Sequence, residues 1–180
     1  MNPTLFIFSG LPASGKSTLA KLIAKEYHAV YLRIDTIEQA LKDLCDIDVQ
    51  GEGYELSYRI AEDNLKMENH VVADSCNPIA LTRQAWEEIA KKNDFLFINI
   101  EIICSDKNEH RKRVETRNCE IKGLKLPTWQ EIENREYHPW ENERIVVDTA
   151  NKSVDESRKE LKEKIKQYLE IKGKDYTFMK

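Results

Sequence analysis

The sequence of 180 residues lacks paired cysteines and long apolar runs. Its four cysteines are scattered and form no C-x-x-C pair, which argues against a zinc site or a disulfide framework and fits reduced thiols in a cytosol. No apolar stretch is long enough to span a bilayer, and the chain does not open with a basic segment followed by an apolar one. We therefore expect a cytoplasmic protein that does not bind membranes.

An excess of positive charge is also missing. The chain has 28 Lys and Arg against 32 Asp and Glu, so its formal net charge is −4. This balance argues against nucleic-acid binding driven by overall charge, although a local basic groove stays compatible with it. With 41% hydrophobic and 33% charged residues, the composition is that of a globular protein. The length suits a single α/β domain, which we expect over residues 1–180.

Short apolar runs alternate with longer amphipathic stretches along the chain. The runs predict five strands, at residues 4–9, 29–34, 70–73, 95–104 and 144–147. Helical spacing predicts helices at residues 17–27, 35–45, 54–69, 79–92, 107–117 and about 154–171, with a further short helix that begins at Thr128. This alternation implies right-handed crossovers and a mostly parallel sheet with helices on both faces. Ligands of such sheets bind at the carboxyl ends of the strands.

One motif stands at such a strand end. Residues 10–17 match the pattern G-x-x-x-x-G-K-[ST], known as Walker A; with the next residue they are Gly10, Leu11, Pro12, Ala13, Ser14, Gly15, Lys16, Ser17 and Thr18. The glycines allow backbone angles that point successive N–H groups at phosphate oxygens. Lys16 suits the β- and γ-phosphates of ATP, and the Ser17 hydroxyl suits Mg²⁺. The motif predicts nucleotide binding, but alone it does not say whether the phosphoryl group goes to water or to a substrate.

Two aspartates follow strands of the predicted sheet. Asp35 comes after the second strand and Asp74 after the third, so both should lie on the edge that carries the phosphate loop. A carboxylate there suits the magnesium shell or accepts a proton from an attacking hydroxyl, but either residue could simply be a helix N-cap. We assign Asp35 as the general base and Asp74, with Ser17, to the metal; a swap of these two roles stays open.

A charged helix precedes the loop at residues 120–127. Arg113 and Arg117 are four residues apart and share one face of this helix. Arginines over a transferring phosphoryl group stabilise its charge and help exclude water, so we expect both to act in catalysis and to bind the nucleotide. The alternative is a solvated face on which they pair with Glu109 and Glu115.

Other residues near strand ends are candidates for binding. Tyr58 and Arg83 could face the acceptor together with Asp35, although packing is as compatible with Tyr58. Asn151, in the loop after the fifth strand, could touch the base of the nucleotide. We expect His138, beside Pro139, to be structural rather than catalytic.

These residues also carry a family resemblance. The chain resembles the small P-loop kinases that include the kinase domain of phage polynucleotide kinase, chloramphenicol phosphotransferase, gluconate kinase and the zeta toxins. The likeness covers nearly the whole chain and rests on residues 10–18, 33–35, 74–78 and 147–149, with Trp86, Arg113 and Arg117. It implies a three-layer α/β P-loop fold with five parallel strands in the order 2-3-1-4-5. It also implies that Asp35 acts on the acceptor hydroxyl and that Arg113 and Arg117 close over the phosphates of ATP. A lid at about residues 118–130 would follow these arginines in the sequence.

The function that we expect is an ATP-dependent kinase that uses Mg²⁺ and phosphorylates a hydroxyl of a small-molecule acceptor. Two alternatives stay open: a nucleotide-driven ATPase or switch that acts on a partner protein, and a polynucleotide 5′-hydroxyl kinase. The sequence shows no clear basic stripe for a nucleic-acid end. The acceptor region, about residues 46–58, matches no substrate signature, and neither the acceptor nor the oligomeric state follows from the sequence.

Overall fold

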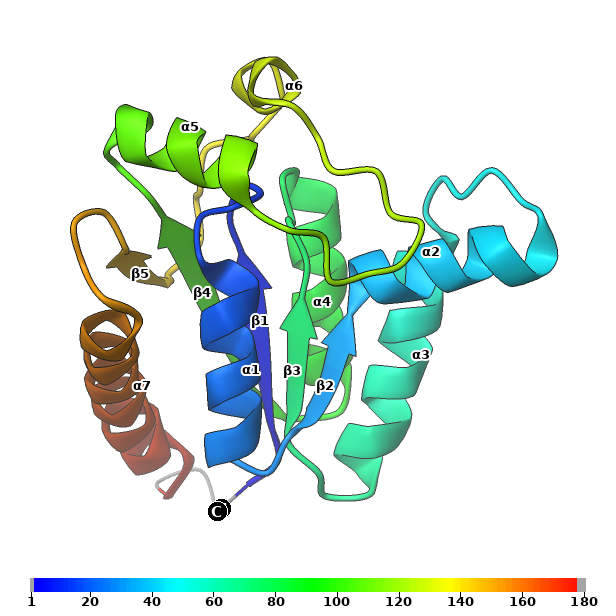
Figure 1. Cartoon of the computed structure of the whole chain (residues 1–180). Helices are drawn as coiled ribbons and strands as arrows, with labels where there is room; N and C mark the ends of the chain where they lie inside the picture. Colours follow the sequence, from blue (N-terminus) through cyan, green and yellow to red (C-terminus); the bar gives the residue numbers. More distant parts are fainter. Residues whose placement is uncertain (1, 178–180) are drawn as a thin grey trace.

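The computed structural model describes residues 2–177, in which a parallel sheet lies between two layers of helices (Figure 1). The strands are β1 (Thr4–Ser9), β2 (Val30–Arg33), β3 (Val71–Asp74), β4 (Leu96–Ile103) and β5 (Ile145–Asp148). They pair in the order β2-β3-β1-β4-β5, and every pair is parallel. The predicted fold class and strand order are confirmed.

Seven helices connect and cover the described strands. They are α1 (Lys16–Glu26), α2 (Ile34–Cys45), α3 (Glu52–Lys66), α4 (Ala80–Lys92), α5 (Lys107–Thr116), α6 (Trp129–Glu133) and α7 (Val154–Thr177). The last helix continues beyond the predicted end at residue 171, and α3 begins two residues before the predicted start at residue 54. None of these helices has both the length and the apolar character that crossing a membrane requires.

The two faces of the sheet have separate cores. On one face, α1 and α7 bury Leu19, Ile23 and Ile165 against β1, β4 and β5. On the other, α3 and α4 bury Leu65 and Trp86 against β1, β2 and β3. Strand β1 is buried at all six positions, as expected of a central strand with apolar side chains on both faces.

The register of the strands brings the predicted site residues to one edge. Phe8 pairs with Asp74 across β1 and β3, and Arg33 pairs with Asp74 across β2 and β3. The phosphate loop therefore begins beside Asp74, and α2 with Asp35 begins one strand further along. Because all strands are parallel, their carboxyl ends meet at this edge.

Candidate functional site

A cavity of about 1060 Å³ opens at the carboxyl edge of the sheet. Its walls come from the loop between β1 and α1, the first turns of α2, α3 and α4, residues 117–127, and the loop between β5 and α7. The phosphate loop and Asp35 therefore share one space, as the sequence predicted for both strand ends. For reference we name its two parts after the sequence predictions: the nucleotide half, at the phosphate loop and the β5–α7 loop, and the acceptor half, between α2, α3, α4 and residues 117–127.

The phosphate loop depends on a glycine where it leaves β1. Gly10 has φ +140°, and a Cβ built there would lie 2.2 Å from the carbonyl oxygen of Ile102, so only glycine fits. Its N–H donates to the carbonyl of Cys76 at 3.1 Å, which ties the phosphate loop to the loop that follows β3. Helix α1 starts at the other end of the loop, and its N-cap, Gly15, offers no side-chain cap. The first N–H groups of α1 are thus left for an anionic ligand.

Lys16 and Asp74 form a buried ion pair beneath the loop. Lys16 Nζ lies 2.7 Å from Asp74 Oδ1, and the Tyr31 hydroxyl donates to Asp74 Oδ2 at 2.6 Å. Burial alone would raise the pKa of Asp74, but Lys16, Tyr31 and Ser17 outweigh burial and lower it. Burial likewise opposes the charge of Lys16, and Asp74 reverses that effect and raises the pKa of the lysine. Both groups stay charged, so the lysine is held at the phosphate loop as a full cation.

Asp35 lies in the first turn of α2 and faces the cavity. No side-chain hydrogen bond or ion pair of Asp35 occurs within residues 2–177. Arg117 is its cationic neighbour: burial lowers the pKa of this guanidinium, and the charge of Asp35 offsets part of the effect. The Nε and one terminal nitrogen of Arg117 are buried without a hydrogen-bond partner in the described part of the chain. An unpaired carboxylate and an unpaired guanidinium thus face one space without a direct ion pair.

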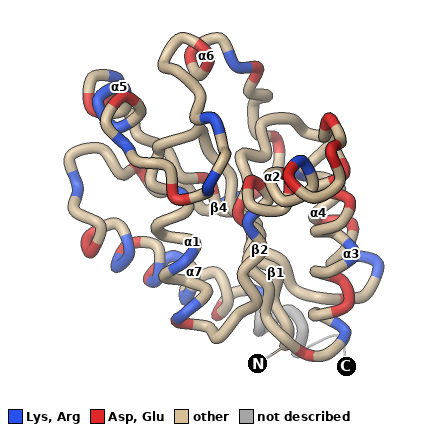
Figure 2. The backbone as a smooth tube through the Cα atoms, turned by 45° about the vertical axis from the view of Figure 1, so that its right-hand side comes forward, with Lys and Arg blue, Asp and Glu red and all other residues tan. Residues whose placement is uncertain are grey.

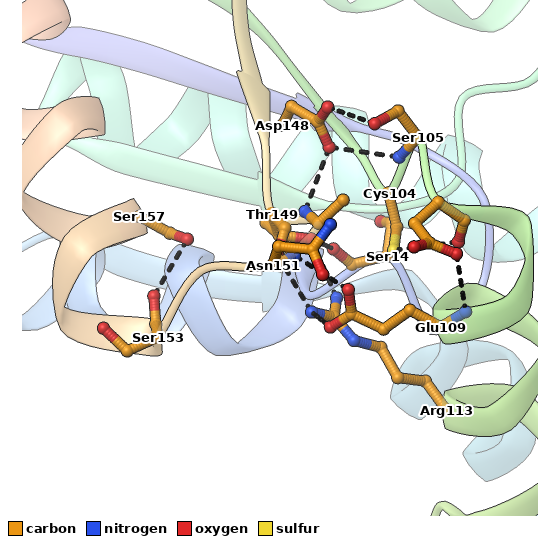
Figure 3. Close-up of polar contacts among 12 residues, drawn as sticks. Ser14, Cys104, Ser105, Glu109, Arg113, Asp148, Thr149, Asn151, Ser153 and Ser157 are labelled. Carbon is orange, nitrogen blue, oxygen red and sulfur yellow. Dashed lines mark hydrogen bonds and ion pairs between the residues drawn. The ribbon is translucent and has the colours of Figure 1, made fainter.

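Arg113 of α5 contacts the β5–α7 loop, which in turn contacts the phosphate loop (Figure 3). Its guanidinium donates to Thr149 Oγ1 at 2.8 Å and to the Thr149 carbonyl at 2.9 Å, and it pairs with Glu109. The Thr149 hydroxyl in turn donates to the carbonyl of Ser14, 2.8 Å away. The β5–α7 loop is thereby fastened both to α5 and to the phosphate loop. The ion pair with Glu109, considered as an alternative for Arg113, forms while the arginine still lines the cavity.

Two predicted ligands are not brought to the cavity. Arg83 is buried and donates to the carbonyls of Asn77, Pro78 and Pro139 at 2.8–3.2 Å. Its guanidinium also stacks 4.1 Å from the ring centroid of Trp140. Because these contacts use both ends of the guanidinium, the expected contact of Arg83 with an acceptor does not occur in this arrangement. Arg83 instead fastens the β3–α4 loop to residues 137–140.

Asn151 is likewise not among the residues that line the cavity. Its backbone N–H donates to Glu109 at 2.8 Å, and its φ of +56° turns the chain toward α7. Its neighbours Thr149 and Lys152 line the cavity in its place. Tyr58 does reach the cavity, on the wall made by α3. His138, expected to be structural, accepts a hydrogen bond from the N–H of Ala80.

Several residues of the site carried no signal in the sequence. His110 is buried, contacts the Pro12 carbonyl through Nε2 at 2.8 Å, and meets the ring of Trp129 edge-on at 5.3 Å. Tyr31 belongs to no motif, and Thr149 lies in the stretch 147–149 that contributes to the family resemblance but has no predicted role of its own. Their positions follow from strand register and loop packing, which only the folded chain displays. The alternation of side chains along β2 could have placed Tyr31 on the face of α1, but not its contact with Asp74.

The donors that could hold a metal are few and suit magnesium. Within residues 2–177, no group of three or more His, Cys, Asp and Glu side chains is arranged around a common point. Magnesium in nucleotide sites takes one or two carboxylates and completes its shell with water and phosphate oxygens. Asp74, which accepts a hydrogen bond from Ser17, and the Ser17 hydroxyl provide such a pair at the start of α1.

Known proteins resemble this chain in sequence and in fold. A family model described as "AAA domain" matches residues 5–132. A candidate kinase from Chloroflexus aurantiacus J-10-fl superposes with a TM-score of 0.71 at 18% identity, covering 92% of this chain and 97% of the other. The APS kinase CysC of Mycobacterium tuberculosis, solved with AMPPNP and APS, gives 0.66 at 18% identity, covering 92% and 98%.

A third solved structure, a gluconokinase from Sinorhizobium meliloti 1021, superposes with a TM-score of 0.60 at 18% identity, covering 88% of this chain and 89% of the other. No curated protein sequence matches the chain. At these identities the likeness shows a shared P-loop fold and leaves the chemistry to be argued from the residues of the cavity.

Proposed function

The chain belongs to the AAA domain family, and on that premise we propose that it is an ATP-dependent phosphotransferase acting on a hydroxyl of a small-molecule acceptor. One observation carries the proposal: a phosphate loop with a charged lysine and an unpaired aspartate line the same cavity. An enzyme that only hydrolysed ATP would not need a second half of this size beside the loop. The relatives with the same fold support the proposal, since one was solved with AMPPNP and APS and another is a gluconokinase.

The nucleotide half supplies the binding of phosphates. The amides of the phosphate loop and the N-terminus of α1 bind the β- and γ-phosphates, and Lys16 donates to their oxygens. Asp74 and Ser17 would hold Mg²⁺, which when bound neutralises phosphate charge. Arg113 and the β5–α7 loop confine the nucleoside, because their hydrogen bonds to each other and to the Ser14 carbonyl fix that wall.

Transfer takes place between Asp35 and Arg117. The acceptor oxygen attacks the γ-phosphorus, the bond from that phosphorus to the β,γ-bridging oxygen breaks, and ADP leaves. The proton of the hydroxyl passes to the carboxylate of Asp35. Arg117, whose buried donors lack partners within the described residues, donates to the oxygens of the transferring group. The products are ADP and a phosphate ester.

Residues 118–130 act as a lid in this scheme. Glu120 in this segment accepts from Arg33 at 2.9 Å and pairs with Lys21 of α1. Residues 117–120 and 124–127 line the cavity, and Gly123 between them lies against α2, since a Cβ built there would be 3.1 Å from Gln39 Nε2. Figure 1 shows this segment running beside α2. A closed lid keeps water from competing with the acceptor hydroxyl.

The test is ADP release from MgATP with and without a panel of alcohols, sugars, nucleosides, antibiotics and a 5′-hydroxyl oligonucleotide. We expect one class of compound to raise the rate strongly and to gain one phosphate by mass spectrometry. Equal ADP release with every compound and no phosphorylated product would instead favour an ATPase that acts on a partner protein. Stimulation by the oligonucleotide that weakens steeply with salt would identify a polynucleotide kinase.

A further inference from the structure

The acceptor half of the cavity has walls of opposite charge. Helices α2 and α3 contribute Asp35, Glu38 and Glu55, and no Lys or Arg of these two helices lines the cavity. Basic lining residues come from elsewhere: from α1, from the end of β2, from α5, from the lid side, which also contributes Glu120, and from the β5–α7 loop. Figure 2 shows several acidic residues along α2 and the loop that follows it. The positive side meets the phosphates of the nucleotide, so the negative side is left for the acceptor.

Glu38 is the central residue of the negative wall. It lies one helical turn after Asp35 on α2, is half-buried, and forms no hydrogen bond or ion pair among residues 2–177. Burial is the main reason why the pKa of Glu38 is raised. The negative charges of Asp35 and Glu52 raise this pKa further, and the positive charge of Lys42 opposes the rise. Lys42 itself does not line the cavity. The carboxylate is therefore in a place that favours a cation supplied from outside the chain.

The position of Glu38 depends on a glycine in the facing helix. A Cβ built at Gly53 of α3 would lie 2.3 Å from Glu38 Cγ, so any other residue there would push the glutamate side chain away. Gly53 is buried and its space is taken by Glu38. Helix α3 therefore has no side chain at this position of its first turn. The space is filled by the side chain of Glu38, which lies between α2 and α3.

Aromatic rings line the same wall as this carboxylate, and Tyr54 is near enough for the charge of Glu38 to act on it. Tyr54 and Tyr58 follow Gly53 on α3, both line the cavity, and their ring centroids are 6.1 Å apart. The ring of Tyr58 is held edge-on against Trp86, with 4.6 Å between centroids. Burial raises the pKa of both tyrosines, so the rings stay neutral. A carboxylate beside neutral aromatic rings is a combination that binds organic ammonium groups.

The remaining wall is apolar. Helix α4 and its loop contribute Ile79, Leu81 and Ala85, and Leu81 is 70% exposed although it is a large apolar side chain. Leu124 and Leu126 of residues 118–130 line the cavity as well. A ligand body of hydrocarbon or aromatic character would bury these side chains, whereas a fully hydroxylated body would leave its hydroxyls without partners there.

We propose that the acceptor is an amino alcohol with an apolar or aromatic body. The inference rests on the proposed kinase function and names its substrate class. The hydroxyl lies at Asp35 and faces the γ-phosphate, the ammonium pairs with Glu38 beside Tyr54 and Tyr58, and the body packs on α4 and the lid. A sugar would satisfy Glu38 by hydrogen bonds alone, and a phosphorylated or carboxylated acceptor would be repelled by this wall.

The test compares amino alcohols with their deaminated partners. A series with bodies of increasing size is used, for example 2-aminoethanol against ethanol and 2-amino-3-phenylpropan-1-ol against 3-phenylpropan-1-ol, at a pH where the amines are protonated. Phosphorylated product and kcat/KM are measured for wild type, for Glu38→Gln and for Glu163→Gln. Glu163 is exposed on α7 away from the cavity, so it provides a charge-matched control.

We expect the amine of the best pair to be preferred about tenfold or more by wild type and by the control, and Glu38→Gln to remove most of this preference. Calorimetric binding of each pair to the MgADP-bound protein repeats the comparison without turnover. If no amino alcohol of the series is bound or phosphorylated better than its partner, or if Glu38→Gln leaves the preference intact, the proposal is overturned. Transfer to a neutral or anionic acceptor, unchanged in Glu38→Gln, would overturn this substrate class and leave the kinase. Absence of transfer to any compound, with equal ADP release, would remove the proposed function as well.

Discussion

The two halves of the cavity differ in how their polar groups are satisfied. In the nucleotide half, Lys16, Asp74 and Thr149 have their partners inside the protein. In the acceptor half, Asp35 and Glu38 have no hydrogen-bond or ion-pair partner among the described residues. In the nucleotide half, contacts within the protein therefore fix the polar side chains before a ligand binds. In the acceptor half, we expect the ligand to provide the partners of Asp35 and Glu38. The following experiments test that contrast, from the largest expected effect to the smallest.

The largest effect is expected from Lys16→Ala. The change removes the cation that meets the phosphates, so ATP turnover should fall below detection, and it leaves Asp74 charged and buried without its ion-pair partner. Loss of one partner of a buried pair costs about 3–5 kcal/mol, which would show as a lower midpoint in urea denaturation. Adding Asp74→Asn should restore much of the stability but none of the turnover. If the double variant is no more stable than Lys16→Ala, the pair is not the source of the loss.

Asp35→Asn should slow phosphoryl transfer without changing folding or ATP binding. Because Asp35 has no internal partner to lose, the variant should fold and bind MgATP as wild type does, while acceptor-dependent transfer falls by roughly 10²–10⁴-fold. Single-turnover transfer and calorimetric ATP binding separate the two effects. Asp43→Asn, on the exposed surface of the same helix, is the control. Wild-type transfer by Asp35→Asn would remove Asp35 as the base and move that role to another group.

Thr149→Val tests the link within the nucleotide half. Valine keeps the shape of threonine but loses the hydroxyl that contacts Arg113 and the Ser14 carbonyl. The loss of one buried hydroxyl should cost about 1–3 kcal/mol of stability, and KM for ATP should rise several-fold while KM for the acceptor stays the same. A rise in both KM values would mean that Thr149 supports the whole cavity and not only the nucleotide half.

The smallest effect, and the only stabilising one, is expected from Glu38→Gln. The raised pKa of Glu38 means that folding disfavours its charged form relative to the unfolded chain. Stability from this group is therefore full below the pKa of the unfolded chain and is lost as pH rises through the folded pKa. Glutamine stays neutral, so the variant should be slightly more stable than wild type at pH 7 and equal to it near pH 3.5, as measured by urea denaturation at both pH values. Equal effects at both pH values would exclude a charge origin.

The opposite sign is expected for the Lys16–Asp74 pair. The pKa of Asp74 is lowered, so the stability it contributes is present above its unfolded pKa and is lost as pH falls through the folded one. The pKa of Lys16 is raised, so its contribution is lost only as pH rises through that higher value. Wild type and Glu38→Gln both contain this pair, so its pH dependence cancels when their stabilities are compared at pH 3.5 and pH 7.

The sequence predicted the nucleotide half far better than the acceptor half, and the reason is physical. Gly10, Lys16 and Ser17 act through the backbone of one short loop, so their spacing along the chain is also their arrangement in space. Asp35 and Asp74 were placed correctly at one edge because parallel strands end together. The strand order followed from the family resemblance and was confirmed.

The errors arise where long-range packing decides the outcome. Arg83 looked like a ligand beside a strand loop, but residues more than fifty positions away, Pro139 and Trp140, enclose its guanidinium. Glu38 is unremarkable in sequence, and it becomes important only because Gly53 of another helix leaves it room. Neither the enclosure of Arg83 nor the space beside Gly53 can be predicted from a local sequence pattern.

The contact of His110 with both Pro12 and Trp129 gives the protein an optical signal of its own. Of three tryptophans, Trp86 is fully enclosed in the core and Trp140 is covered by Arg83, whereas Trp129 begins the helix at the end of the lid, against an imidazole that also meets the phosphate loop. An imidazole beside an indole changes the indole's emission when the separation changes. If residues 118–130 move as the proposed lid, we expect intrinsic fluorescence to report the change in the separation of Trp129 and His110 without an attached dye.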